Sequence, residues 1–118
     1  MSQLIRVVDL EIGEVSLVAV EGEIDASNAR EVAGRLRGAL TNHSFALVAD
    51  LEATTFMDSA GINALFALDD ELRQRRQRLH LVIRPGTAVA RVAAITGLDR
   101  TVATHADRAD ALAAAGKH

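Results

Sequence analysis

The feature that most constrains the fold of this chain is a repeated alternation between short apolar runs and segments with helical periodicity. Residues 45–51 form one apolar run, and large apolar side chains then recur at helical spacing over residues 62–72. A second apolar run at 79–83 precedes an amphipathic segment at 89–95. Such strand–helix units favour an α/β fold, in which right-handed helical crossovers join parallel strands.

The N-terminal part of the chain predicts a different arrangement. Residues 8–12 alternate in polarity, as a strand with one solvent-facing side does, and Gly13-Glu14 fits a tight hairpin turn. Residues 15–20 are almost continuously apolar and predict a more buried strand, after which residues 29–40 carry one apolar helical face. We therefore expect a β-hairpin followed by the first helix.

The C-terminal part predicts shorter elements. Gly97 is placed to end the helix at 89–95 in a left-handed cap. Thr101 to Thr104 is expected to form a short strand, and residues 107–115 a terminal helix. No internal repeat or linker interrupts the chain. We therefore expect residues 1–118 to form one domain, with a mixed, mostly parallel sheet, an N-terminal β-hairpin and about four helices.

Composition excludes several classes of function. Apolar residues make up 49% of the chain, the formal net charge is −3, and Trp, Tyr and Cys are absent. A nucleic-acid binder would carry a basic surface and usually aromatic stacking platforms, so we expect no direct nucleic-acid contact. The stretch Met1 to Arg6 has no long apolar run, so we expect neither a signal peptide nor a membrane span. These features predict a cytoplasmic domain.

Common catalytic and cofactor motifs are also missing. The sequence has no GxxxxGK[ST] loop, no GxGxxG turn and no GxSxG elbow, and its four histidines are scattered without ligand spacing. Asp50 closes an apolar run as the phospho-acceptor of a response-regulator receiver does, but the only lysine is Lys117 in the tail. Asp50 is better interpreted as closing its strand or capping the next loop. We predict no catalytic residue, no cofactor and no metal.

The stretch from Phe56 to Gly61 (Phe-Met-Asp-Ser-Ala-Gly) is the most informative for function. Its hydroxyl residue, Ser59, follows an acidic residue and precedes two small ones, where a loop meets a predicted helix. Free backbone N–H groups and the helix dipole favour added negative charge at such a position. Ser59 is therefore either the N-cap of the helix, a site for a phosphate, or both.

This stretch resembles the phospho-acceptor motif of the STAS domains, specifically of the bacterial anti-sigma factor antagonists. Three further segments are similar to the family pattern in the same order: Gly22 to Asp25, Ala46 to Leu51, and Thr96 to Leu98. The resemblance spans nearly the whole chain and implies a single STAS domain.

The resemblance implies a switch protein and not an enzyme. In that family the unphosphorylated antagonist binds an anti-sigma factor that is also a serine kinase, which frees the sigma factor. The kinase then uses ATP to phosphorylate the antagonist, which dissociates, and a PP2C-type phosphatase resets it. By this resemblance Ser59 is the acceptor, and the expected partner-binding residues are Asp25, Thr55, Met57, Asp58, Ser59, Ala60, Gly61 and Asn63.

Some positions allow two interpretations. Asp25 either caps its helix or contacts the partner, as Ser27 could also cap. Phe56 is expected in the core under the loop, whereas Met57 is expected as a contact, because methionine suits adaptable surfaces. Ala60 stands where the family often has a second serine, and Asn63 where glycine is frequent. Thr54 and Thr55 are minor alternative acceptors.

Two alternatives to the antagonist function stay open. The chain could be a STAS subunit of another assembly, such as a stress-signalling scaffold or a lipid-transport ATPase complex. A small hydrolase that uses Ser59 is conceivable but has no motif in its favour. The basic run from Arg73 to Arg78 ends a helix, where cations complement the dipole, and is interpreted as a solvated face.

Overall fold

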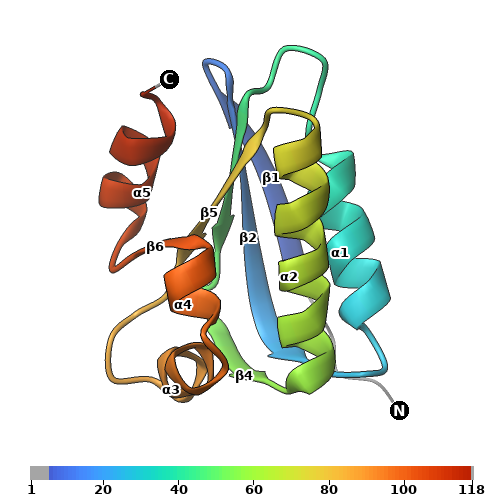
Figure 1. The fold of residues 1–118 in the computed structure, drawn as a ribbon, viewed down its shortest axis with the longest axis vertical. Helices are drawn as coiled ribbons and strands as arrows, with labels where there is room; N and C mark the ends of the chain where they lie inside the picture. The colour runs from blue at the N-terminus through green and yellow to red at the C-terminus, as the bar shows by residue number, and fades with distance from the viewer. Residues whose placement is uncertain (1–5, 118) are drawn as a thin grey trace.

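A mixed β-sheet runs through the centre of the protein, with helices on both of its faces (Figure 1). The computed structural model describes residues 6–117, and residues 7–11 are described by their backbone alone. Within this part of the chain the strands are β1 (Arg6–Ile12), β2 (Val15–Ile24), β3 (Ala46–Asp50), β4 (Thr54–Met57), β5 (Arg78–Val82) and β6 (Ala103–His105). The helices are α1 (Ala29–Gly38), α2 (Ser59–Gln74), α3 (Ala88–Thr96), α4 (Leu98–Thr101) and α5 (Arg108–Ala115).

The sheet confirms the predicted fold class. Its order is β1-β2-β3-β5-β6, the β1–β2 pair is an antiparallel hairpin, and the pairs from β2 to β6 are parallel. The described part holds five helices where about four were expected, because a single turn, α4, follows α3 directly. Gly97 separates the two with φ 83°, which confirms the predicted left-handed cap. The strand expected at 101–104 begins later, since Thr101 still belongs to α4.

Strand β4 was not predicted, and it leads directly into the first turn of α2, where the candidate acceptor Ser59 lies. The first half of β2 pairs with β3, and its last three residues, Gly22 to Ile24, pair in parallel with β4. Between β3 and β4 the chain makes a turn, in which the Thr54 N–H donates to the Leu51 carbonyl at 3.0 Å. Two short strands, first β3 and then β4, therefore pair with the long β2. Strand β4 extends the sheet towards the start of α2.

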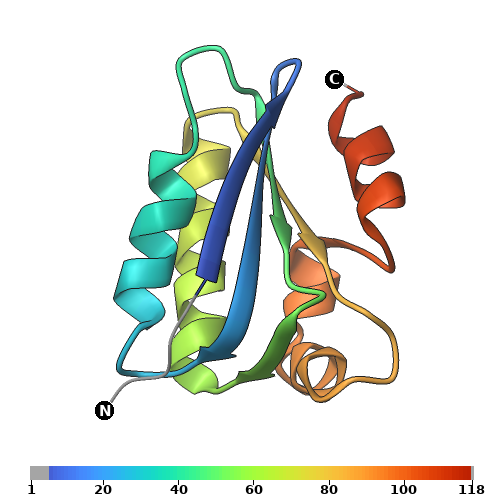
Figure 2. The same cartoon turned by 180° about the vertical axis from the view of Figure 1, so that it is seen from behind.

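Two apolar clusters hold the layers together. On one face the sheet packs against α1 and α2, which lie side by side, and the larger cluster fills the space between them. On the other face a smaller cluster joins Leu17, Val48 and Val82 of the sheet to Ala111 and Ala115 of α5. Figure 2 shows α5 on the opposite side of the sheet from α1 and α2.

An ion pair between a buried carboxylate and a partly exposed arginine connects α5 to the sheet. Asp50, only 3% exposed at the end of β3, accepts hydrogen bonds from Arg108 Nε at 2.8 Å and Nη2 at 2.7 Å. Its other oxygen accepts from the Glu52 N–H at 2.9 Å. Asp50 thus caps the loop after its strand, as predicted, and also binds the first residue of α5, which the sequence did not indicate.

Candidate functional site

The parallel pairing of β2 with β4 brings two distant acidic residues to one edge of the sheet. Ile24 pairs with Met57, and the Asp58 N–H donates to the Ile24 carbonyl at 3.1 Å. The next residues, Asp25 and Asp58, therefore leave the sheet at the same edge, where α2 begins. Both side chains are half-buried.

Asp58, and not Ser59, is the N-cap of α2. Its Oδ1 accepts hydrogen bonds from the Ala60 N–H at 2.9 Å and the Gly61 N–H at 3.2 Å. Ser59 is the first residue of the helix and is exposed. Within residues 6–117 its hydroxyl makes no hydrogen bond. The interpretation of Ser59 as the cap is therefore wrong, and its hydroxyl is free in solvent beside the first turn.

The loop before α1 is organised by Asp25 and Asn28. Asp25 Oδ1 accepts hydrogen bonds from both the hydroxyl and the N–H of Ser27, and these bonds lower the pKa of the Asp25 carboxyl from its ordinary value. The N-cap of α1 is Asn28 rather than Asp25 or Ser27. Its buried side chain accepts from the Asp25 N–H at 3.0 Å and donates to the Glu23 carbonyl at 2.8 Å. Because its pKa is lowered, the Asp25 carboxyl stays ionised, and it lies at the same edge of the sheet as Asp58.

Met57 and Gly61 were expected at the partner surface but lie in the core. Met57 is 1% exposed, whereas Phe56, expected in the core, is 44% exposed. The exchange follows from β4 being a strand, because successive side chains of a strand point to opposite faces. Gly61 is also buried, and a Cβ there would lie 2.5 Å from Met57 Cγ and 2.9 Å from Ile24 Cγ2. Met57 and Gly61 therefore position the first turn of α2 from beneath.

Three of the remaining predicted residues are at least partly accessible to solvent. Thr55 and Asn63 are exposed, and Ala60 is half-buried. The minor candidate Thr54 is 5% exposed, and its hydroxyl donates to the Val20 carbonyl at 2.8 Å, so it is inaccessible to a modifying enzyme. A groove of about 470 Å³ with alanine walls opens between α1 and α2, and Ala60 and Asn63 line it.

Comparison with known proteins identifies the family. A model of the STAS domain matches residues 7–111, so this chain belongs to the STAS domain family. It is similar to an anti-sigma factor antagonist from Mycobacterium paratuberculosis, with 32% sequence identity over 95% of this chain and 94% of the other, at a TM-score of 0.85. The comparison with curated proteins gives no significant match.

Two more distant proteins share the fold. One is the anti-sigma factor antagonist SpoIIAA, 16% identical over 94% of this chain and 96% of the other in its unphosphorylated form, with a TM-score of 0.64. SpoIIAA from Bacillus has also been solved phosphorylated, at 17% identity, 94% and 98% coverage and a TM-score of 0.62. The other is the murine anion transporter Slc26a9, 18% identical over 92% of this chain but only 19% of the transporter, with a TM-score of 0.79.

A histidine pair lies away from this site, on β5 and β6. His80 Nδ1 and His105 Nε2 are 3.0 Å apart, and their rings stack with centroids separated by 5.2 Å. Local sequence patterns could not predict this pair, because 25 positions separate the two histidines and only the β5–β6 register brings them together. No group of three ligand-type side chains in the described part of the chain could hold a metal ion, and no helix there is long and apolar enough to cross a bilayer.

The His80–His105 pair predicts that the folded state loses stability in mild acid. Burial, the neighbouring His105 and the cation of Arg78 lower the pKa of His80 from its ordinary value of 6.5. Between the folded pKa and 6.5 the unfolded chain binds more protons, so stability falls as pH decreases through this window and levels off below it. Urea unfolding at a series of pH values between about 7.5 and 5 measures this slope.

The control is a second histidine in a different environment. His43 is exposed in the loop before β3, so a His43→Gln variant keeps the acid-dependent loss. A His80→Gln variant removes the perturbed group and flattens the slope over the same range. Equal slopes for the His80→Gln variant and the wild type would show that His80 is not the group responsible.

Proposed function

We propose that this protein is an anti-sigma factor antagonist controlled by phosphorylation of Ser59. In its unphosphorylated form it binds an anti-sigma factor that is also a serine kinase, and so frees the sigma factor in a bacterial cytoplasm. The observation that carries the proposal is the exposed hydroxyl of Ser59. Because Asp58 caps the helix, this hydroxyl is not needed as the cap and stays accessible to a kinase. The similarity to a mycobacterial protein described as an anti-sigma factor antagonist supports it.

This chain is the substrate in the switch, and the partners supply the catalysis. The Ser59 oxygen bonds to the γ-phosphorus of ATP held by the kinase, the β–γ phosphoanhydride bond breaks, and ADP leaves. A base of the kinase takes the hydroxyl proton. A PP2C-type phosphatase reverses the modification with water, which restores the hydroxyl and releases inorganic phosphate.

The capping arrangement determines where the phosphate group points. Asp58 Oδ1 already accepts from the Ala60 and Gly61 N–H groups, so a phosphate on Ser59 finds these donors occupied. The phosphate adds about −1.5 to −2 charges next to the acidic side chain of Asp58. It therefore stays in solvent, on the surface that the partner covers.

The proposed partner surface contains Asp25, Thr55, Asp58, Ser59, Ala60 and Asn63, with Phe56 added as an exposed apolar anchor. A large apolar side chain surrounded by polar residues is typical of a binding surface. The two carboxylates favour a partner with basic residues opposite them, because complementary charge steers association. Met57 and Gly61 act from below by holding the first turn of α2 in place.

The direct test is phosphotransfer. We expect incubation with the cognate anti-sigma kinase and ATP to add a single phosphate, which mass spectrometry of proteolytic fragments places on Ser59. A Ser59→Ala variant accepts none, while Thr101→Ala, which removes an exposed hydroxyl from α4, is modified as the wild type is. A phosphate found on Thr55, or retained in the Ser59→Ala variant, would refute the assignment.

A second candidate is a STAS subunit within a larger assembly. The observation that favours it is the shared fold with part of the transporter Slc26a9, of which this chain covers 19%. Affinity purification of the chain from its native cells separates the two proposals. An associated kinase supports the antagonist, whereas a stoichiometric ABC-type ATPase supports a transport complex.

A further inference from the structure

The groove of about 470 Å³ between α1 and α2, called here the α1–α2 groove, has an apolar floor. Alanines line both of its walls: Ala29 and Ala33 on α1, and Ala60, Ala64 and Ala67 on α2. Successive alanines of each wall are three or four residues apart, so they share one face of their helix. Ala67 is exposed at the rim, and the other four are buried or half-buried.

The groove adjoins the candidate phosphorylation site. Both helices begin at the same edge of the sheet and run side by side (Figure 1). Ala26, which follows Asp25, and Ala60, which follows Ser59, both line the groove. A protein that covers Ser59 therefore also meets one end of the groove.

Packing of the two helices does not require this opening. Beneath the alanines, Val32, Leu36 and Leu65 are already buried. A larger apolar side chain at Ala33 or Ala64 would occupy the groove and bury more apolar surface, which stabilises a fold. The helices instead leave an apolar recess open to solvent, as is typical of a surface that another protein covers.

The charges at the two ends of the groove differ. Arg37 lines the end away from Ser59 and pairs with Glu71 at 2.7 Å, so its charge is compensated. Arg30 lines the end where α1 begins, is exposed, and forms no ion pair within residues 6–117. An acidic residue of a bound protein would compensate Arg30, so the groove favours an occupant that is apolar and carries an acidic group.

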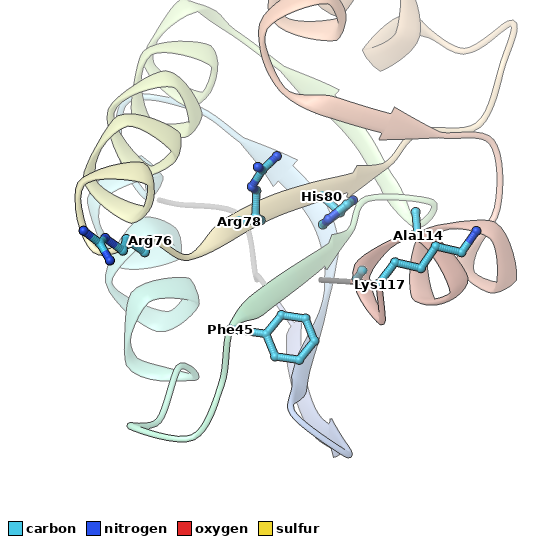
Figure 3. A pocket seen from close by; sticks show the side chains of 7 residues that line it. Phe45, Arg76, Arg78, His80, Ala114 and Lys117 are labelled. Atoms are coloured by element: carbon cyan, nitrogen blue, oxygen red, sulfur yellow. The ribbon is translucent and has the colours of Figure 1, made fainter.

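A second pocket, of about 420 Å³, lies between the start of β5 and the end of α5 and has a different character (Figure 3). Its cations Arg76, Arg78 and Lys117 point in different directions, so they do not converge on one ligand. Arg78 also interacts with the buried carboxylate of Asp69. The α1–α2 groove, in contrast, combines an apolar floor, an uncompensated cation and direct continuity with the Ser59 surface.

We propose that the α1–α2 groove receives an amphipathic helix of the anti-sigma partner, an inference that rests on the antagonist function proposed above. From Ala60 to Ala67 the wall of the groove rises about 10 Å, at about 1.5 Å per residue. This length accommodates two large apolar side chains one or two turns apart on the docked helix. An acidic residue of that helix lies against Arg30, so the contact extends well beyond Ser59.

The first test follows the alanine methyl groups of the full chain by NMR, with ¹³C-labelled alanine methyls and the unlabelled cognate kinase. We expect the methyl signals of Ala64 and Ala67 to shift or broaden as the complex forms. Ala113 is the control, because it is exposed on α5, on the opposite side of the sheet (Figure 2), and its methyl signal should not change.

Three outcomes of this titration would overturn the proposal for different reasons. A change at Ala60 without any change at Ala64 and Ala67 would limit the contact to the first turn of α2 and leave the switch at Ser59 intact. Changes at Ala64 and Ala67 on raising the concentration of the chain alone would assign the groove to a second copy of this protein. A kinase that did not bind the chain at all would contradict the antagonist function itself.

Ala64→Leu tests the groove by filling it. We expect this variant to bind the kinase at least about tenfold more weakly, mainly through faster dissociation, because the apolar anchors of the partner lose their recess. Ala113→Leu adds the same side chain on α5 and should bind as the wild type does. Thermal unfolding of both variants checks that Ala64→Leu, at a half-buried position, is folded at the temperature of the measurement.

Arg30→Glu is a second variant whose effect does not depend on packing. Arg30 is exposed in the first turn of α1, where an acidic residue suits the helix dipole, so the variant should fold as stably as the wild type. We expect association to slow by at least about threefold at low salt, and the difference to shrink at about 0.5 M salt. Arg35→Glu makes the same charge change on an exposed part of α1 outside the groove and should have a smaller effect.

Surface plasmon resonance with the immobilised kinase measures both rates for all four variants. Wild-type kinetics for both Ala64→Leu and Arg30→Glu would overturn the groove proposal. If Ser59→Asp still weakened binding in the same experiment, the phosphorylation switch would stand without the groove.

Discussion

We expect a Ser59→Asp variant to bind its anti-sigma partner at least about thirtyfold more weakly than the wild type. A new charge at position 59 finds no free N–H donor at Ala60 or Gly61, because Asp58 Oδ1 already accepts hydrogen bonds from both. A docked partner must then desolvate that charge beside Asp58. Uncompensated burial of a charge at an interface costs about 2–5 kcal/mol, and the lower limit corresponds to about thirtyfold in affinity. Favourable interaction with the helix dipole, about 0.3–1 kcal/mol, is too small to offset it.

Titration calorimetry with the purified kinase measures the effect, and two variants serve as controls. Ser59→Ala removes the acceptor without adding charge, so it should bind within about threefold of the wild type. Asn42→Asp adds the same charge in the loop before β3 and should leave the affinity unchanged. If Ser59→Asp and Asn42→Asp bound equally well, the charge-repulsion account of the switch would fail.

Local patterns were sufficient to predict most of the fold. The apolar runs at 45–51 and 79–83 became β3 and β5, and the Gly13-Glu14 turn and the Gly97 cap lie where expected. These features depend on residues close together in the sequence, because strand periodicity, helical periodicity and glycine turns are local properties. The position of Ser59 in the first turn of α2 was predictable for the same reason.

The features that sequence reasoning missed depend on pairing between distant segments. Thr54 to Met57 resembles a loop until β2 provides a partner for it, and that pairing decides that Met57 is buried and Phe56 exposed. The His80–His105 contact likewise exists only through the register of β5 with β6. A shift of one residue in either register would exchange the two faces, so no local pattern could have settled these points.

Gly61→Ala should destabilise the protein even though alanine is the better helix former. The added Cβ would lie 2.5 Å from Met57 Cγ and 2.9 Å from Ile24 Cγ2, so the first turn of α2 must move away from the strands beneath it. Overpacking of this kind costs about 1–3 kcal/mol, against a gain of up to about 1 kcal/mol in helix propensity. We therefore expect a net loss of about 1–2 kcal/mol in the free energy of unfolding.

Gly34→Ala is the matched control, because it makes the same change in another helix. Gly34 lies in α1, is exposed, and has nothing within 4 Å of an added Cβ. Alanine there should raise the free energy of unfolding by about 0.5–1 kcal/mol, so urea unfolding should place the two variants on opposite sides of the wild type. If both alanine variants were more stable than the wild type, the first turn of α2 would not pack closely on β4. The explanation of how Ser59 is held in position would then fail. Because Gly61 and Ser59 share the first turn, Gly61→Ala should also weaken partner binding, while Gly34→Ala should not.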